Sequence, residues 1–255
     1  MKLSIKFSLF LIFQILLFSN LPAQIPEEAM NRGNDFYQKN NYTEAEKTYK
    51  ELVDNGYESP VLYYNLGNAE YKLGNLGYAI YYYEKALKLS PNDEDIIQNI
   101  KIANLHTVDK INEVPKLFIT RWWNNIVVFL SVNAWSFILL LVFALFLFYL
   151  WLYLRTKKSN MQRIAFFSGS IAFIVLLFVF VVWLSRVNIE TSEDYGILLE
   201  KSITVKVSPD YQSNDAFILH EGVKFSIEEK LNGWFKIKLS DGKIGWLNQT
   251  AVGKI

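Results

Sequence analysis

Two long apolar stretches stand out in the pattern of hydrophobic and polar positions along the chain. They cover residues 134–154 and 164–185, and neither contains Asp, Glu, Lys, Arg or His. A helix needs about 20 residues to cross about 30 Å of hydrocarbon, so each stretch is long enough for one crossing. Because no charge opposes insertion, the pattern predicts a two-helix transmembrane hairpin.

The connector between the two stretches, residues 155–163, is short and basic and has no acidic residue. Its cations are Arg155, Lys157, Lys158 and Arg163. A short loop rich in Lys and Arg stays in the cytoplasm, according to the positive-inside rule. We therefore expect a cytoplasmic loop here, with both flanking regions on the opposite side of the membrane.

Tryptophans gather near the ends of the apolar stretches and in the segment that precedes them. Residues 117–133 are too polar, at Arg121, Asn124 and Asn125, to form a third span. We expect an interfacial amphipathic segment there, lying along the membrane surface. Indole rings prefer the headgroup level. The predicted membrane anchors are Trp122, Trp123, Trp135, Trp151 and Trp183.

The first 23 residues have the layout of a secretory signal peptide. Lys2 and Lys6 precede an apolar run over residues 7–18, and a polar, helix-breaking stretch follows at 19–23. Cleavage after Ala23 and retention as an uncleaved anchor are both open. In either case the next segment is exported, which agrees with the sidedness of the hairpin.

Residues 26–108 contain an internal repeat. The offset between Asn31 and Asn65 is 65 − 31 = 34 residues, and the same offset relates Tyr49 to Tyr83. This is the period of tetratricopeptide helix pairs. The second copy has Leu66-Gly67, then Ala79, Tyr83, Ala86 and the helix-ending Pro91, and it resembles the tetratricopeptide repeat family. We interpret residues 93–106 as a capping helix.

The resemblance implies a groove for a peptide along the inner face of the first helix of each repeat. On this chain the groove residues would be Asn31, Asn34, Tyr37, Asn65, Asn68, Tyr71 and Lys72. The alternative is that these residues are repeat consensus with a packing role only. Both interpretations are open at this point.

Residues 190–255 change to the alternating pattern of half-buried strands, as in 203–207 and 234–239. Asn232-Gly233 and Asp241-Gly242 suit tight hairpin turns. Residues 233–247 resemble the bacterial SH3 domain, which implies a small all-β SH3-like barrel. Trp234 and Trp246 are a possible SH3 ligand platform for a cell-wall or peptide ligand. The alternative is that one or both fill the barrel core.

Composition narrows the chemistry. The chain has no Cys, only two His and a formal net charge of +1. The first two counts remove thiol chemistry and leave little for histidine, while the third argues against nucleic acid as a partner. No Walker-type glycine loop, G-x-S-x-G or H-E-x-x-H motif is present. We therefore expect a non-enzymatic protein with no catalytic residues, no cofactor and no metal.

The order of signal, repeats, Arg121-Trp122-Trp123 segment, hairpin and SH3-like domain resembles the E-type proteins of the Bacteroides aerotolerance (Bat) operon. The resemblance implies a bacterial inner-membrane protein with both soluble modules in the periplasm. It also implies Bat partners with von Willebrand A domains and a MoxR-type ATPase system, in aerotolerance or envelope stress.

Two functions follow as hypotheses. The first is a multidomain membrane scaffold that presents the tetratricopeptide and SH3-like modules for protein–protein interaction, with membrane lipid as its other contact. The second is an envelope sensor that binds peptidoglycan through the SH3-like domain.

Overall fold

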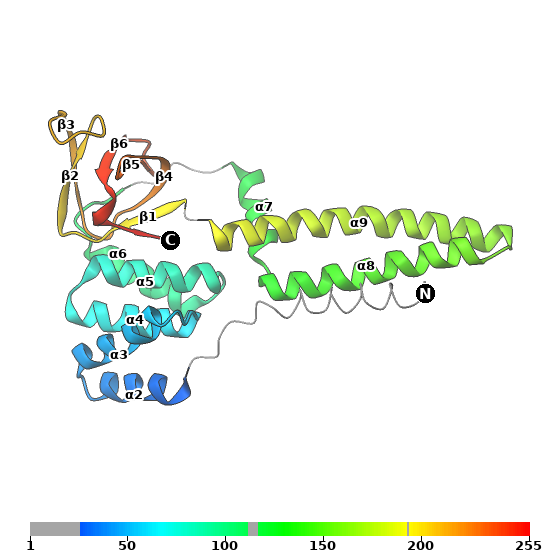
Figure 1. Cartoon of the computed structure of the whole chain (residues 1–255), viewed down its shortest axis with the longest axis horizontal. Helices are drawn as coiled ribbons and strands as arrows, with labels where there is room; N and C mark the ends of the chain where they lie inside the picture. The colour runs from blue at the N-terminus through cyan, green and yellow to red at the C-terminus, as the bar shows by residue number, and fades with distance from the viewer. Residues whose placement is uncertain (1–25, 112–116, 193) are drawn as a thin grey trace.

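The computed structural model describes residues 26–111, 117–192 and 194–255. The predicted signal peptide at 1–23 lies outside these residues. Figure 1 shows an elongated molecule, in which a long two-helix arm carries a head made of stacked helices and a β-sheet. The head contains segments from both sides of the arm in the sequence.

The helical part of the head consists of antiparallel helix pairs closed by a single helix. Local sequence explains several helix starts, because Ser59 and Asp93 accept hydrogen bonds from backbone N–H groups of the first turn. The predicted capping helix at 93–106 is confirmed, with Asp93 as its N-cap. The helices are α2 (Glu27–Gln38), α3 (Tyr42–Asp54), α4 (Pro60–Leu73), α5 (Leu76–Leu89) and α6 (Glu94–His106).

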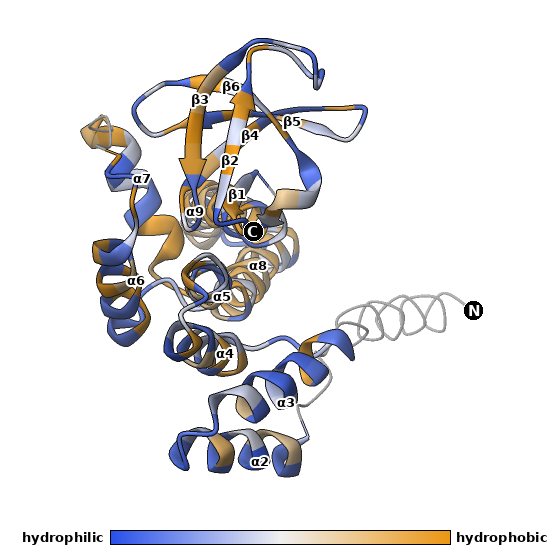
Figure 2. Ribbon diagram, turned by 90° about the vertical axis from the view of Figure 1, so that its left-hand side faces the viewer, coloured by the Kyte–Doolittle hydropathy of each residue, from blue (hydrophilic) through white to orange (hydrophobic). Residues whose placement is uncertain are grey.

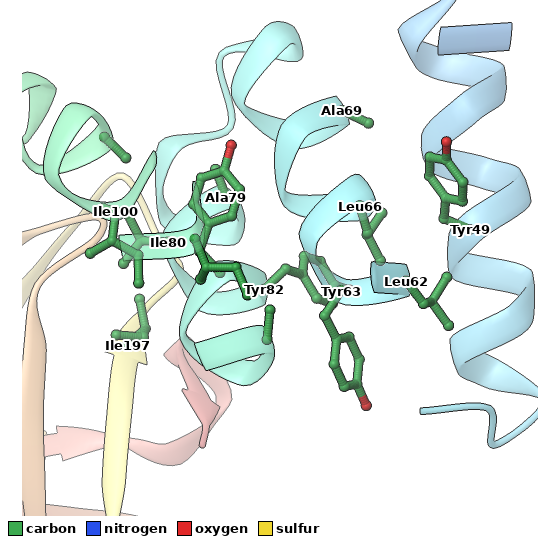
Figure 3. Close-up of a cluster of buried hydrophobic side chains, with 14 of the residues drawn as sticks. Tyr49, Leu62, Tyr63, Leu66, Ala69, Ala79, Ile80, Tyr82, Ile100 and Ile197 are labelled. Atoms are coloured by element: carbon green, nitrogen blue, oxygen red, sulfur yellow. The ribbon is translucent and has the colours of Figure 1, made fainter. Parts of the chain in front are cut away.

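Glycine at the repeated position lets the helices of each pair approach closely. A Cβ atom on Gly67 would lie 2.6 Å from Cδ1 of Tyr83, and Gly33 meets the ring of Tyr49 in the same way. Tyr63 and Leu66 fill the seam between the pairs (Figure 3). The close helix pairs therefore follow directly from the 34-residue repeat found in the sequence.

Two helices form the arm, α8 (Val132–Arg155) and α9 (Ser159–Thr191). Both are long and apolar enough to cross a membrane. Only residues 156–158 separate them, so the connector is shorter than the predicted 155–163. The preceding α7 (Phe118–Val128) lies across the base of the arm (Figure 1). The predicted interfacial segment at 117–133 thus consists of this shorter helix, a turn and the start of α8.

The remaining residues form one antiparallel sheet in the order β3-β2-β6-β5-β4-β1-β7. Within the described strands no pairing joins β3 to β7, so the sheet is open and the closed barrel expected from the sequence is not observed. The strands are β1 (Tyr195–Leu198), β2 (Ser202–Lys206), β3 (Asp215–His220), β4 (Lys224–Leu231), β5 (Trp234–Leu239), β6 (Ile244–Asn248) and β7 (Val252–Lys254), with a 3-10 turn at Gln249–Ala251.

The sheet packs directly against α5. Ile197 of β1 and the C-terminal Ile255 belong to the same buried cluster as the repeat helices (Figure 3). Glu221 accepts a hydrogen bond from the backbone N–H of Gly77 at 3.0 Å, at the N-terminal end of α5 where a carboxylate is favoured. Lys224 pairs with the buried Glu84 at 2.6 Å. The repeats and the sheet therefore share one core.

The arm is also joined to the head by specific contacts. Arg186 of α9 has no exposed surface, and it donates to the backbone oxygen of Lys88 at 3.2 Å near the C-terminal end of α5. Its other partner is Glu190 at 3.3 Å. The ammonium group of Lys88 in turn donates to the backbone oxygen of Ser192. These contacts fix the end of α9 against the repeats.

Candidate functional site: the inner face of the repeats

Two adjoining hollows lie along the inner face of α2, α4 and α6. Their volumes are about 270 and 220 Å³, and Tyr37 and Asn68 line both. The larger hollow is lined by Tyr37, Tyr64, Asn68, Tyr71, Lys72, Tyr83, Asn99 and Ile102. The smaller is lined by Asn34, Tyr37, Gln38, Tyr49, Asn65 and Asn68.

The structure brings most of the predicted groove residues together. Asn34, Tyr37, Asn65, Asn68, Tyr71 and Lys72 line the two hollows. Asn31 is exposed and lines neither hollow, so its predicted place in the groove is wrong. The reason is its position near the start of α2, a full turn before Asn34.

Sequence reasoning missed Asn99 and Ile102 of α6 as groove residues. The signal was present, because Asn99 lies 34 residues after Asn65, 99 − 65 = 34. Treating residues 93–106 only as a cap removed them from consideration. The third inner helix is thus part of the groove wall as well as the end of the stack.

A hydrogen-bond network repeats along the groove with the period of the sequence. Oδ1 of Asn34 accepts from the Tyr49 hydroxyl at 2.7 Å and from Nδ2 of Asn65 at 3.0 Å. One repeat later, Oδ1 of Asn68 accepts from the Tyr83 hydroxyl and from Nδ2 of Asn99, both at 2.8 Å. These bonds connect the three inner helices to one another.

The network combines both interpretations of the asparagines. Their carbonyl oxygens stabilise the stack, whereas Nδ2 of Asn34 and of Asn68 has no hydrogen-bond partner among the described residues. The exposed Lys72 adds a cation to the same wall. The groove therefore offers donors, which suit the carbonyl groups or a carboxylate of a bound peptide.

The tyrosines of the network remain protonated at neutral pH. Burial raises the pKa of Tyr49 to about 12, and burial also raises the pKa of Tyr83. Each hydroxyl can therefore donate to its asparagine, which requires the amide oxygen to face the tyrosine. This fixes the amide nitrogen as the group left for a ligand.

A second candidate surface lies on the outer face of the sheet. Phe235, Ile237 and Leu239 point into the sheet core, so Trp234 lies on the other face, and Trp246 shares that face. The possibility that these tryptophans fill the core is therefore wrong. Trp234 is only 7% exposed, because the ring of Tyr211 stands edge-on to it at 4.8 Å.

Tyr211 was not predicted as a site residue. It is 70% exposed, and its hydroxyl accepts a hydrogen bond from Asn248 at 2.6 Å. It lies between β2 and β3, where the sequence offered no local motif. The exposed part of the predicted platform is therefore Tyr211 with the half-buried Trp246, and Trp234 supports them from below.

The predicted membrane anchors divide into two groups. Trp122 and Trp151 are exposed. Trp123 packs in the α7–α9 cluster, and its ring meets that of Phe178. Trp135 is buried and donates to the backbone oxygen of Val127, while Trp183 donates to the hydroxyl of Ser136. Packing between helices therefore holds these three, because their indole groups find partners inside the protein.

The four cations predicted to set topology lie at the tip of the arm, far from the head (Figure 1). Arg155, Lys157, Lys158 and Arg163 are all exposed, and no ion pair within the described ranges involves them. The charge of the tip is therefore not neutralised by the rest of the chain.

Comparison with known families agrees with the helical part of the structure. A family model described as tetratricopeptide repeat matches residues 30–94, which span most of α2, all of α3, α4 and α5, and the first residue of α6. A search of curated proteins found no match to the chain. Residues 30–94 are thus similar to tetratricopeptide repeats, a class that generally mediates binding of protein partners.

Proposed function

We propose that the protein is a non-enzymatic membrane scaffold whose repeat groove holds an extended segment of a partner protein. One observation carries the proposal: the residues predicted from the 34-residue period line adjoining hollows and leave amide donors unused. Such donors suit a peptide backbone in extended form, since its carbonyl groups need partners once water is excluded.

The arm supplies the second half of the proposal. Two apolar helices with a basic tip favour a two-pass inner-membrane protein with the tip in the cytoplasm. The head, which contains the repeats and the sheet, would then lie entirely on the periplasmic side. The exposed Phe118 and Trp122 of α7, at the base of the arm, suit contact with lipid headgroups.

The order of the modules supports a place among the E-type Bat proteins, with von Willebrand A-domain siblings and a MoxR-type ATPase system as candidate partners. The strand pattern of residues 233–247 supports a bacterial SH3 relationship for the sheet. In this reading the groove recruits a sibling protein, and the sheet positions the groove above the membrane.

Site-specific crosslinking in living cells tests the scaffold function. A photoreactive amino acid at Tyr71, inside the larger groove hollow, should crosslink to a discrete polypeptide. The product should disappear when Lys72 is changed to Glu in the same protein, because the donor character of the wall is reversed.

The matched control places the same photoreactive group at Lys47 on α3, outside both hollows. The same product from Lys47, or a Tyr71 product that survives Lys72→Glu, would contradict recognition through the groove.

The alternative function is an envelope sensor that binds peptidoglycan on the outer face of the sheet. The exposed Tyr211 ring beside Trp234 and Trp246 favours it, because sugar rings stack on exposed aromatic groups. Saturable retention of the full-length protein, held in lipid discs, on purified sacculi would support this function. Tyr211→Ala should abolish the retention, whereas Tyr78→Ala, an exposed tyrosine on α5, should leave it unchanged.

A further inference from the structure

The outer edge of β3 is open for pairing. β3 stands first in the strand order and pairs only with β2 among the described strands. The opposite end of the sheet differs, because Gly253 of β7 packs against the ring of Tyr81 on α5. One edge of the sheet is thus covered by the repeats and the other is left uncovered.

Two hydrogen bonds establish which backbone groups of β3 point outward. The N–H of Glu221 donates to Lys201, on the β2 side, and the N–H of His220 donates to the carboxylate of Asp109, away from β2. Successive residues of a strand alternate between its two edges. Ala216 and Ile218 therefore turn their N–H and C=O groups outward, as His220 does.

The open stretch is short and self-complementary. Asp109 occupies the outward N–H of His220 at one end, and a bond from Val207 to Asn214 closes the other end. A second copy could place its Ile218 opposite Ala216, and its Ala216 opposite Ile218, about a two-fold axis at Phe217. This antiparallel register forms two reciprocal pairs of backbone hydrogen bonds.

Side chains fit the same register. Ile218 is 60% exposed and would lie opposite the small Ala216 of the second copy, so each large side chain meets a small one. Phe217, half-buried at the margin of the sheet core, would meet Phe217 of the second copy across the axis. The β3 edge also lacks Pro and Lys, the residues that commonly protect free edges.

The direction of the axis agrees with a shared membrane. A two-fold axis between antiparallel edge strands is perpendicular to the sheet. Figure 2 looks along the arm, with α8 and α9 seen end-on, and the ribbons of β2 and β3 face the viewer. The axis therefore runs roughly along the arm, so two paired copies would send their arms in the same direction.

We propose that the open edge of β3 is the contact through which a second copy of this chain pairs, antiparallel and two-fold symmetric, with the arms of both copies in one membrane. The orientation step rests on the proposed membrane insertion, whereas the hydrogen-bond register does not.

Mixed disulfides test the register in membranes, and the chain has no native cysteine to interfere. Full-length Ala216→Cys and Ile218→Cys proteins with different tags are produced together and exposed to a mild oxidant. Opposed residues lie about 5.5 Å apart between Cα atoms, within disulfide range. We expect a dimer that carries both tags. Ala216→Cys alone should give none, because two copies of residue 216 are diagonal neighbours.

Pairing Ala216→Cys with Ile244→Cys, an exposed position on the interior strand β6, is the matched control. Ala216→Pro provides a second measurement, since it removes an outward N–H that β2 does not use. The dimer fraction in lipid discs should fall about tenfold, as expected for a loss of about 1.4 kcal/mol. Heat unfolding should remain unchanged.

If Ala216→Pro impairs folding, Ile218→Lys takes its place, because it brings two cations together near the axis. Absence of the mixed disulfide, equal yield with Ile244→Cys, or a folded edge variant that remains dimeric would overturn the proposal. Thiol labelling at the arm tip of the same membranes reports insertion separately, so failure of pairing and failure of the membrane assignment are distinguishable.

Discussion

Individual residues show where the repeat departs from its consensus. Glu70 occupies a position where the tetratricopeptide pattern usually has an aromatic residue, and it is only 3% exposed. Its carboxylate accepts a hydrogen bond from Asn75 at 2.7 Å. Burial raises the pKa of Glu70, and the bond from Asn75 offsets only part of this. The repeat thus carries a carboxylate whose charge is costly to bury.

Glu70→Gln should therefore stabilise the protein at neutral pH. The raised pKa of Glu70 means that its contribution to stability is full below the unfolded pKa of about 4.3 and is lost as pH rises through the folded pKa. The heat-unfolding midpoint of the variant should exceed that of the wild type at pH 7, and the difference should shrink as pH falls toward 4. An equal difference at both pH values would contradict a buried, charged Glu70. The exposed Glu200→Gln is the control and should change little.

The asparagine network provides a second prediction for single residues. Asn68→Ala removes the shared acceptor of Tyr83 and Asn99, so it should lower the free energy of unfolding by about 1–3 kcal/mol. Asn31→Ala, at an exposed position in the first repeat, should change it by less than about 0.5 kcal/mol. Denaturant unfolding of the full chain in detergent compares the two, and equal effects would show that the network adds no stability.

Contacts between elements explain why α5 has a glycine in its first turn. A Cβ atom on Gly77 would lie 2.8 Å from the backbone oxygen of Leu198 and 3.2 Å from Cβ of Glu221. The helix must therefore carry glycine here to contact the sheet. The sign of a Gly77→Ala substitution reports whether the contact exists.

Gly77→Ala should destabilise the head by about 1–3 kcal/mol, because backbone atoms must move to admit the methyl group. If α5 and the sheet were separate, the same change would stabilise the helix by up to about 1 kcal/mol. Heat unfolding of the full chain measures the sign. Lys85→Ala, a half-buried position on the same helix with no close contact to the sheet backbone, serves as a control for general changes in α5.

At the same scale, sequence periodicity explains part of the fold. The 34-residue offset predicts the helix pairs and most of the groove wall, because each inner helix repeats the same contacts. It does not predict the contact of Gly77 with Glu221, which joins residues 144 positions apart. Periodicity also failed at Trp135, since a uniformly apolar helix has no polar side to distinguish a lipid-facing ring from a packed one.

For the whole molecule, sidedness is the property that most affects function. Ser240→Cys, on an exposed turn of the sheet, should react with a membrane-impermeant thiol reagent while the inner membrane is intact. Lys157→Cys, at the arm tip, should react only after that membrane is breached. The native chain has no cysteine, so it is the unlabelled control. The reverse order of labelling would contradict a periplasmic head.

The continuity of α9 has a consequence for direction. This helix runs without a break from the arm tip to Thr191, and Arg186 fixes its end to α5. Each residue of an α-helix turns the chain by about 100°, so helical phase sets the compass bearing of the groove around the membrane normal. Every copy must face its groove at the same bearing relative to its own arm. In a pair joined through β3, the two grooves would face bearings half a turn apart, and each would receive its own partner.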